Sequence, residues 1–274
     1  MNVSYDFSSE VAVITGAARG VGRALVAAFA AAGCKVVAAD RDPGGLRETS
    51  RHHGDAVLAV TADVSTEEGA DAIVGTAVRE FGALSFCINN AAVAPHTSLL
   101  EETARVWDAV YAVNSRGTFL MTQRAARAMI DQGRGGRIVN FSSGVSGRGS
   151  PGAAAYASSR AATESFTRVA AIELAPYGIL VNCVSPGLID TQPKPLPPAM
   201  AESLGRRIPR LPLARPGNPD EVAGAVLWLC SDGSSYVTGS ICHVDGGAGV
   251  GGRAGAPVVD DDVRYDWVTG RNRK

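Results

Sequence analysis

A glycine-rich turn follows the first apolar run of the chain. Residues 11–15 are predicted to form a strand, and three glycines then lead into a helix with the spacing G-x-x-x-G-x-G. Glycines in such a turn let the backbone approach a pyrophosphate, and the helix N-terminus offers free N–H groups and a positive dipole end. The spacing is wider than the common G-x-G-x-x-G, and similar turns also occur for packing alone. The turn predicts a dinucleotide site that includes Gly16, Arg19, Gly20, Val21 and Gly22.

A carboxylate stands at the end of the second predicted strand, twenty residues after Gly20. Asp40 can there accept hydrogen bonds from both hydroxyls of an adenosine ribose and would repel a 2′-phosphate. Arg19 and Arg41 act in the opposite direction, because either could pair with such a phosphate. We give the carboxylate more weight, so NAD is the expected cofactor and NADP the less favoured one. A solvated strand end is the alternative interpretation of Asp40.

A serine pair, a tyrosine and an arginine occur at a characteristic spacing. Tyr156 follows Ser143 by thirteen residues and precedes Arg160 by four. Together with the glycine turn and the other motifs below, this pattern resembles the short-chain dehydrogenase/reductase superfamily. The resemblance covers residues from about Val11 to Gly247, with its motifs in the right order. Besides residues 15–22, the motifs are Asn89-Asn90-Ala91-Ala92, Asn114, Ser142-Ser143, Tyr156-x-x-x-Arg160, Ser185-Pro186-Gly187 and Val244-Asp245-Gly246-Gly247.

The resemblance implies four catalytic residues. Tyr156 would be the general acid/base that exchanges a proton with the substrate oxygen while hydride moves to or from C4 of the nicotinamide. A free phenol has a pKa of about 10, so it needs a neighbouring cation to work near neutrality. Ser143 would hydrogen-bond the substrate oxygen, and Asn114 would hold a water in a proton relay. Singly, Tyr156 could be an ordinary helix aromatic and Ser143 a helix cap. The fourth catalytic residue is Arg160.

The same resemblance implies residues that surround the cofactor and the substrate. Asp63 would accept a hydrogen bond from the adenine amino group, with Val64 beside it. The cofactor would pass over Asn90, Ala91 and Ala92. Its nicotinamide would be flanked by Pro186, Gly187, Ile189 and Thr191, and Tyr156 and Arg160 complete the cofactor set. Candidates for the substrate pocket are Ala94, His96, Val145, Leu188 and a proline-rich loop.

Two positions depart from the family pattern. Ala92 replaces the glycine of the usual Asn-Asn-Ala-Gly, and Arg160 replaces the lysine of Tyr-x-x-x-Lys. Residues at i and i+4 share one helix face, so Arg160 is correctly placed. A guanidinium stays charged but cannot pass a proton on as an ammonium can. The first hypothesis is therefore an oxidoreductase interconverting a secondary alcohol and a ketone. The alternative is a cofactor-retaining non-redox catalyst or binding module.

The elements that must position these residues follow a repeated pattern. Short apolar runs alternate with Ala-rich stretches, which predicts βα units in one α/β domain of the Rossmann type. The expected fold is a doubly wound parallel sheet of about seven strands flanked by helices. The predicted strands are 11–15, 35–39, 56–61, 85–89, 137–141, 179–184 and 240–244, and the predicted helices are 21–32, 66–81, 103–130, 154–176 and 219–229.

Two segments interrupt this rhythm. Residues 187–219 contain eight prolines, which predicts a long irregular loop of the kind that often covers a substrate. We expect the catalytic domain to span residues 1–247 and residues 248–274 to be an extension. Its glycines predict flexibility, while Tyr265 and Trp267 offer an apolar anchor for a neighbouring subunit.

Composition narrows the range of partners. The 274 residues carry a net charge of -1, without the basic excess that nucleic acid or an anionic membrane would attract. No apolar run could span a bilayer and no signal peptide is recognised, so a cytoplasmic location is expected. The five cysteines and four histidines lack metal-site spacing, so no metal is expected. The expected partners are a small alcohol or ketone and further copies of the chain, in a homotetramer or homodimer paired through helix 154–176.

Overall fold

The computed structural model describes residues 3–191, 195–251, 264–266 and 271–273. A seven-stranded parallel sheet with the strand order β3-β2-β1-β4-β5-β6-β7 lies at its centre. This confirms the predicted doubly wound sheet. The chain order reverses between β1 and β4, which in open α/β sheets is the point where a crevice forms at the carboxyl ends of the strands. The strands are β1 (Val11–Thr15), β2 (Lys35–Asp40), β3 (Val57–Thr61), β4 (Phe86–Asn89), β5 (Gly136–Phe141), β6 (Ile179–Pro186) and β7 (Ile241–Val244).

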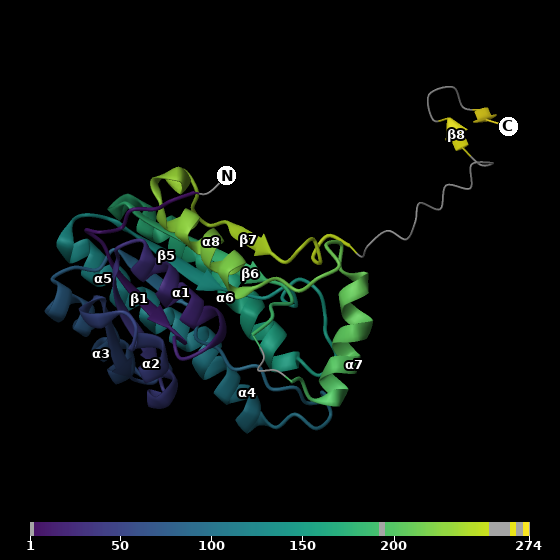
Figure 1. Ribbon diagram of the computed structural model, residues 1–274, viewed down its shortest axis with the longest axis horizontal. Helices are drawn as coiled ribbons and strands as arrows, with labels where there is room; N and C mark the ends of the chain where they lie inside the picture. Colours follow the sequence, from purple (N-terminus) through teal and green to yellow (C-terminus); the bar gives the residue numbers. More distant parts are fainter. Residues whose placement is uncertain (1–2, 192–194, 252–263, 267–270, 274) are drawn as a thin grey trace.

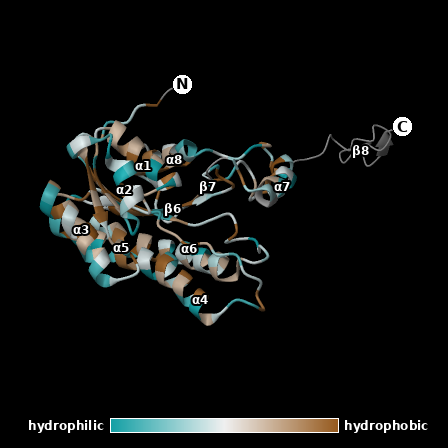
Figure 2. Ribbon diagram, turned by 60° about the horizontal axis from the view of Figure 1, so that its bottom comes forward, coloured by the Kyte–Doolittle hydropathy of each residue, from teal (hydrophilic) through white to brown (hydrophobic). Residues whose placement is uncertain are grey.

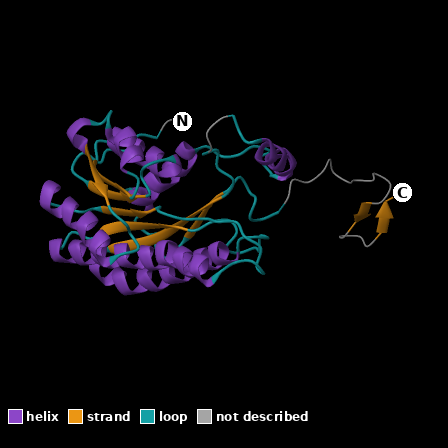
Figure 3. Cartoon of the chain, turned by 90° about the horizontal axis from the view of Figure 1, so that it is seen from below, coloured by secondary structure: helices purple, strands orange, loops and turns teal. Residues whose placement is uncertain are grey.

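Helices cover both faces of the sheet (Figures 1 and 3). One face is packed by α1 (Gly20–Ala31), α2 (Pro43–Ser50) and α8 (Pro219–Cys230). The other face is packed by α3 (Glu67–Phe81), α5 (Thr118–Gln132) and α6 (Ala154–Leu174), with α4 (Ala104–Tyr111) against α6. Short 3-10 turns lie at Gly54–Ala56, Ala175–Tyr177, Ile208–Arg210 and Asp232–Ser234.

The two cores explain why the strands are apolar throughout. Ala12 and Ile14 of β1 point into the core under α1 and α8, and Val11 and Val13 point into the core under α3 and α5. Alternate residues of a strand face opposite sides, so a strand covered on both sides needs apolar residues at every position. Figure 2 shows the hydrophobic colouring concentrated where the helices meet the sheet.

Helix α2 was not predicted from the sequence, although its start signals are present. Asp42 accepts hydrogen bonds from the N–H groups of Gly44 and Gly45, at 3.0 and 3.1 Å, and Pro43 occupies the first helical position. Both features are typical of a helix N-terminus. The two glycines in the first turn weaken the helical pattern, which explains why no helix was predicted here.

Two further segments differ from prediction. The single helix expected over 103–130 is α4, a π-helical segment (Ala112–Gly117) and α5. The segment 187–219, expected to be irregular throughout, contains the helix α7 (Pro198–Arg207), with Pro198 in its first turn where proline is tolerated. Helix α7 lies beyond the carboxyl ends of the strands (Figure 1).

The C-terminal region contributes little to the described structure. The strands β8 (Arg264–Asp266) and β9 (Arg271–Arg273) pair with each other and not with the main sheet. Most of the predicted extension, including Trp267, lies outside the described residues, so its boundary at residue 248 stays a prediction. Within the part of the chain that the structure describes, no helix is both long and apolar enough to cross a membrane.

Candidate active site

The carboxyl ends of six strands, β1 to β6, border one cleft of about 790 Å³. It is lined by every predicted cofactor residue except Ile189, and by Ser143. The cleft therefore brings together residues that are up to 175 positions apart, from Gly16 to Thr191. It does not include the four named substrate-pocket candidates Ala94, His96, Val145 and Leu188. Sequence reasoning missed the lining residues Ala18, Asp42, Ala62, Val93, Val113, Phe141 and Ser142.

The glycine turn after β1 is shaped by close backbone approaches. Gly16 and Gly20 have φ of 67° and 56°, in the left-handed region that favours glycine. A Cβ on Gly22 would lie 2.0 Å from the carbonyl oxygen of Gly16, so this position admits no side chain. Asn90 ties the turn to β4 by donating to the carbonyl oxygens of Thr15 and Gly16, at 2.9 and 3.2 Å.

The first turn of α1 keeps its N–H groups available. The residue that precedes the helix, Arg19, makes no capping hydrogen bond with its side chain. The first N–H groups of a helix lack partners within the helix and attract anions. The turn and the start of α1 therefore suit the diphosphate of a dinucleotide.

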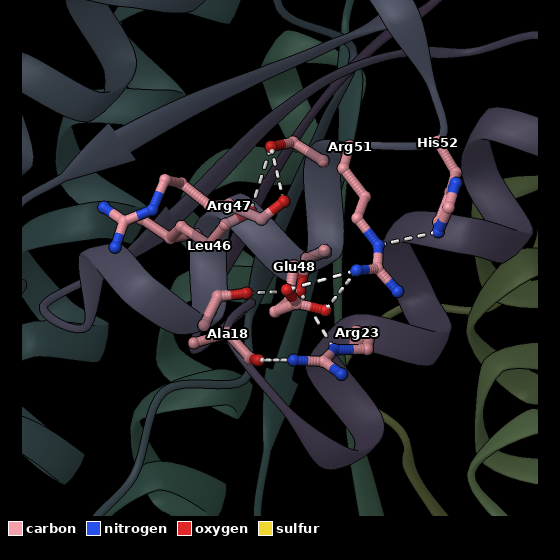
Figure 4. Close-up of polar contacts among 10 residues, drawn as sticks. Ala18, Arg23, Leu46, Arg47, Glu48, Arg51 and His52 are labelled. Atoms are coloured by element: carbon pink, nitrogen blue, oxygen red, sulfur yellow. Dashed lines mark hydrogen bonds and ion pairs between the residues drawn. The ribbon is translucent and has the colours of Figure 1, made fainter.

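Asp40 lies at the end of the cleft next to the glycine turn, where two backbone N–H groups fix its carboxylate. Its Oδ2 accepts from the N–H of Ala18 at 3.1 Å, and its Oδ1 accepts from the N–H of Asp42 at 3.1 Å. Behind this edge, Arg23 donates to the carbonyl oxygen of Ala18 at 2.6 Å and to Thr49 Oγ1 at 3.1 Å, which joins α1 to α2 (Figure 4). The carboxylate is thus fixed beside the glycine turn.

Charged groups surround that end of the cleft. Arg19 and Arg41 are exposed, and so is Asp63. Partial burial raises the pKa of Asp63, but hydrogen bonds from Ser65 and the charges of Arg41 and Arg116 outweigh burial and lower it overall. Asp63 is therefore a carboxylate at neutral pH, able to accept hydrogen bonds from a ligand.

Tyr156 and Arg160 meet Ser143 at the opposite end. Ser143 follows the end of β5, and α6 supplies the other two side chains. The guanidinium carbon of Arg160 lies 5.4 Å from the centre of the Tyr156 ring. Burial raises the pKa of Tyr156, but the Arg160 charge and hydrogen bonding with Ser143 and Arg160 lower it, and the net shift is downward.

Arg160 is the most deeply buried charged side chain of the cleft. It is 3% exposed, and its Nη1 donates to the carbonyl oxygen of Phe141 at 2.7 Å. Its Nε is buried without a hydrogen-bond partner in the protein. A buried unpaired donor is costly, and a ligand oxygen in the cleft could satisfy it. This orphaned donor, with the glycine turn, indicates that the residues present fit a dinucleotide.

Asn114 lies behind the cleft in the π-helical segment. It is fully buried, its Oδ1 accepts from the N–H of Val93 at 2.9 Å, and its Nδ2 donates to Val93 O and Ser159 Oγ at 3.0 and 3.1 Å. Both amide protons are therefore committed to protein acceptors. A relay water at Asn114 would have to share Oδ1 with Val93.

The geometry agrees with what comparison with known proteins finds. Residues 16–249 match the family model described as Enoyl-(Acyl carrier protein) reductase. The chain is 37% identical over 251 residues to a 3-oxoacyl-[acyl-carrier-protein] reductase of Synechocystis sp., covering 88% of this chain and 97% of the relative. It is 34% identical to a galactitol 2-dehydrogenase of Agrobacterium fabrum, with coverage of 88% and 97%.

A solved structure agrees as well. The crystal structure of a short-chain type dehydrogenase/reductase from Mycobacterium marinum matches with a TM-score of 0.82 at 34% identity, over 88% of this chain and 96% of that chain. The chain belongs to the short-chain dehydrogenase/reductase family, an oxidoreductase family that uses a nicotinamide cofactor. The relatives are named as reductases and dehydrogenases, so the comparisons do not favour the non-redox alternative.

Proposed function

We propose that this chain is an NAD-dependent oxidoreductase that interconverts a secondary alcohol and a ketone on a small molecule. The observation that carries the proposal is the placement of Tyr156: its ring centre lies 5.4 Å from the guanidinium carbon of Arg160, and both residues line one cleft with Ser143 and the glycine turn. Burial raises the pKa of Tyr156, but the Arg160 charge and hydrogen bonding with Ser143 and Arg160 lower it overall. A phenol with a lowered pKa can exchange a proton at neutral pH. The nicotinamide, when bound, supplies or accepts the hydride.

The side chains of this end of the cleft have separate roles in the proposal. Ser143 orients the substrate oxygen by a hydrogen bond, and Tyr156 donates a proton to that oxygen in reduction or removes one in oxidation. Arg160 stabilises the phenolate through its fixed charge and offers its unpaired Nε to a ribose hydroxyl. Asn114 holds the segment at Val93 in place behind the cleft.

The direct test is reduction of ketones with NADH. The relatives include a 3-oxoacyl-[acyl-carrier-protein] reductase and a galactitol 2-dehydrogenase, so the panel should contain a 3-oxoacyl thioester and a ketose. NADH oxidation that depends on one of these ketones supports the proposal. Tight NADH binding without turnover of any ketone in the panel would instead revive the non-redox alternative.

We predict that NADH binds more tightly than NADPH. The Asp40 carboxylate is fixed beside the glycine turn. It would lie close to the 2′-phosphate of NADPH, which NADH lacks, and like charges placed together cost several kcal/mol. The preference should be at least about tenfold, or 1.4 kcal/mol, when dissociation constants are compared by calorimetry. Asp40→Ser should narrow it, whereas the control Asp55→Ser, at an exposed residue outside the cleft, should not. Equal or tighter binding of NADPH would show that Arg19 and Arg41 bind the phosphate.

We also propose that copies of this chain assemble into a homotetramer or homodimer. Apolar side chains are exposed on neighbouring helices: Trp107 of α4 (37%), Phe119 of α5 (42%), and Val169 and Ile172 of α6 (50% and 77%). Large apolar side chains exposed on neighbouring helices are typical of an interface when they form one patch. Sedimentation equilibrium should give two or four times the chain mass of 28.2 kDa, and a monomer at micromolar concentration would contradict the assembly.

A further inference from the structure

A single carboxylate on α6 holds the turn that carries Ser143. Glu164 Oε1 accepts hydrogen bonds from Ser142 Oγ, at 2.6 Å, and from Ser146 Oγ. The Glu164 side chain is 16% exposed, and its other oxygen lies 3.9 Å from Arg168 Nη2. One carboxylate oxygen thus binds the turn on both sides of Ser143.

The rest of the turn is anchored to β6 through its backbone. Ser142 N–H donates to the carbonyl oxygen of Val184 at 2.8 Å, and Gly144 N–H donates to that of Pro186 at 3.1 Å. These bonds fix the turn to the sheet but not to α6. Side chains join the turn to α6, the helix that carries Tyr156. Glu164 accepts from both serine hydroxyls, Ser142 Oγ also donates to the carbonyl oxygen of Arg160 at 3.4 Å, and Arg160 Nη1 donates to that of Phe141 at 2.7 Å. Glu164 supplies the contact that reaches the turn on both sides of Ser143.

Glu164 lies on the same face of α6 as Tyr156 and Arg160. It stands four residues after Arg160 and eight after Tyr156, so the three side chains lie along one face of α6. Glu164 therefore helps to hold the turn that carries Ser143 against the same helix that carries Tyr156, together with the contacts made by Arg160.

The charge of Glu164 reaches the same buried region as that of Arg160. The pKa of the Cys183 thiol is raised to about 12: burial and the Glu164 charge raise it, and the Arg160 charge lowers it. Glu164 and Arg160 therefore act on the same buried thiol, and the Glu164 carboxylate contacts two serine hydroxyls and Arg168.

We propose that Glu164 is a positioning residue of this active site, which fixes Ser143 against Tyr156 by accepting hydrogen bonds from Ser142 and Ser146. This inference rests on the proposed function. Glu164 does not line the cleft, so its effect on the substrate is exerted through the turn. Small displacements of a positioned group can reduce a rate by about 10²-fold.

The first experiment compares Glu164→Ala with Glu164→Gln. Alanine removes the acceptor, and kcat should fall by roughly 10- to 100-fold while the dissociation constant of NADH stays unchanged. Glutamine keeps a carbonyl oxygen that can accept from both serines, so it should restore most of kcat. Glu173→Ala, which removes an exposed carboxylate of the same helix, is the matched control and should behave like the wild type.

The second experiment removes the hydroxyl donors. The double variant Ser142→Ala with Ser146→Ala should lose at least as much kcat as Glu164→Ala, because Ser142 lines the cleft and its hydroxyl also donates to the carbonyl oxygen of Arg160. Adding Glu164→Ala to the double variant should cost no more, because Glu164 acts through these two hydroxyls. Without NADH, the phenolate absorbance of Tyr156, isolated by subtracting a Tyr156→Phe variant, should titrate at higher pH in the double variant. The reason is that the hydrogen bond with Ser143, which lowers the pKa of Tyr156, is weakened.

Three results would overturn the inference: wild-type kcat in Glu164→Ala, additive losses in the triple variant, or a fall in kcat matched by an equal loss of NADH affinity. A wild-type protein that reduces no ketone would instead contradict the proposed function. The phenolate titration would still decide whether Glu164 positions Ser143, so the two failures are distinguishable.

Discussion

Tyr156→Phe should abolish ketone reduction and leave NADH binding intact. The change removes the phenolic oxygen and keeps the ring, which lies against the Arg160 guanidinium. A general acid/base contributes on the order of 10²–10⁴-fold, so kcat should fall by that factor. Steady-state kinetics gives kcat, and NADH fluorescence gives the dissociation constant.

The matched control for this variant is Tyr177→Phe, at an exposed tyrosine in the turn that follows α6. It removes the same atom outside the cleft and should keep full activity. A Tyr156→Phe protein that retains more than about a tenth of the wild-type kcat would show that another group carries the proton, because such a loss is far below the usual contribution of a general acid.

The sheet could be predicted from the sequence because its signals are local. Strands buried on both faces are continuous apolar runs, and the turns after them carry glycine, aspartate or serine. Each strand was located to within two residues at either end. Helix α7 was missed because the segment is rich in proline, which is unfavourable in the interior of a helix. Pro198, however, stands in the first turn of α7, where proline is tolerated.

The site was less predictable in its supporting contacts. The predicted cofactor and catalytic residues have motif spacing, but Asn114 and Glu164 bind partners that are distant in sequence. Val93 is 21 residues from Asn114, and Ser142 is 22 residues from Glu164. One signal could have identified Glu164: it continues the helical face of Tyr156 and Arg160 by one turn. Which hydroxyls it would meet depends on the fold.

Arg160→Ala should impair the enzyme in two separable ways. The Nη1 bond to the carbonyl oxygen of Phe141 is lost, which leaves a buried acceptor unpaired at a cost of about 1–3 kcal/mol. The positive charge beside Tyr156 is also lost, so the pKa of the phenol rises. Alcohol oxidation needs the phenolate, so its rate increases as the pH rises through that pKa. The midpoint of this increase should therefore lie below the pKa of free tyrosine in the wild type and move to higher pH in the variant.

Measuring NADH binding and the melting temperature of Arg160→Ala distinguishes a loss of site function from a loss of stability. If Nε binds a ribose hydroxyl, Arg160→Ala weakens NADH binding. The melting temperature should fall only slightly, because the protein loses a single hydrogen bond, the one to the carbonyl oxygen of Phe141. Arg127→Ala, at an exposed arginine of α5, should change neither quantity. A pH profile of Arg160→Ala that coincides with that of the wild type would show that Arg160 does not set the pKa of Tyr156.

Arg160→Lys tests the arginine at the position where the sequence resemblance implies a lysine. An ammonium keeps the charge that lowers the pKa of Tyr156, and unlike a guanidinium it can also pass a proton on. Turnover should therefore be preserved or increased, with NADH binding retained. Suppose instead that the lysine variant loses most of kcat while NADH still binds. The guanidinium would then be required because it can donate to the carbonyl oxygen of Phe141 and to a ligand oxygen at the same time. Arginines that bind carboxylates or phosphates use their several donors in the same way. Arg160 would in that case be selected for the hydrogen bonds it makes, and proton transfer in this cleft would have to end at Tyr156 and the solvent rather than continue through the residue at position 160.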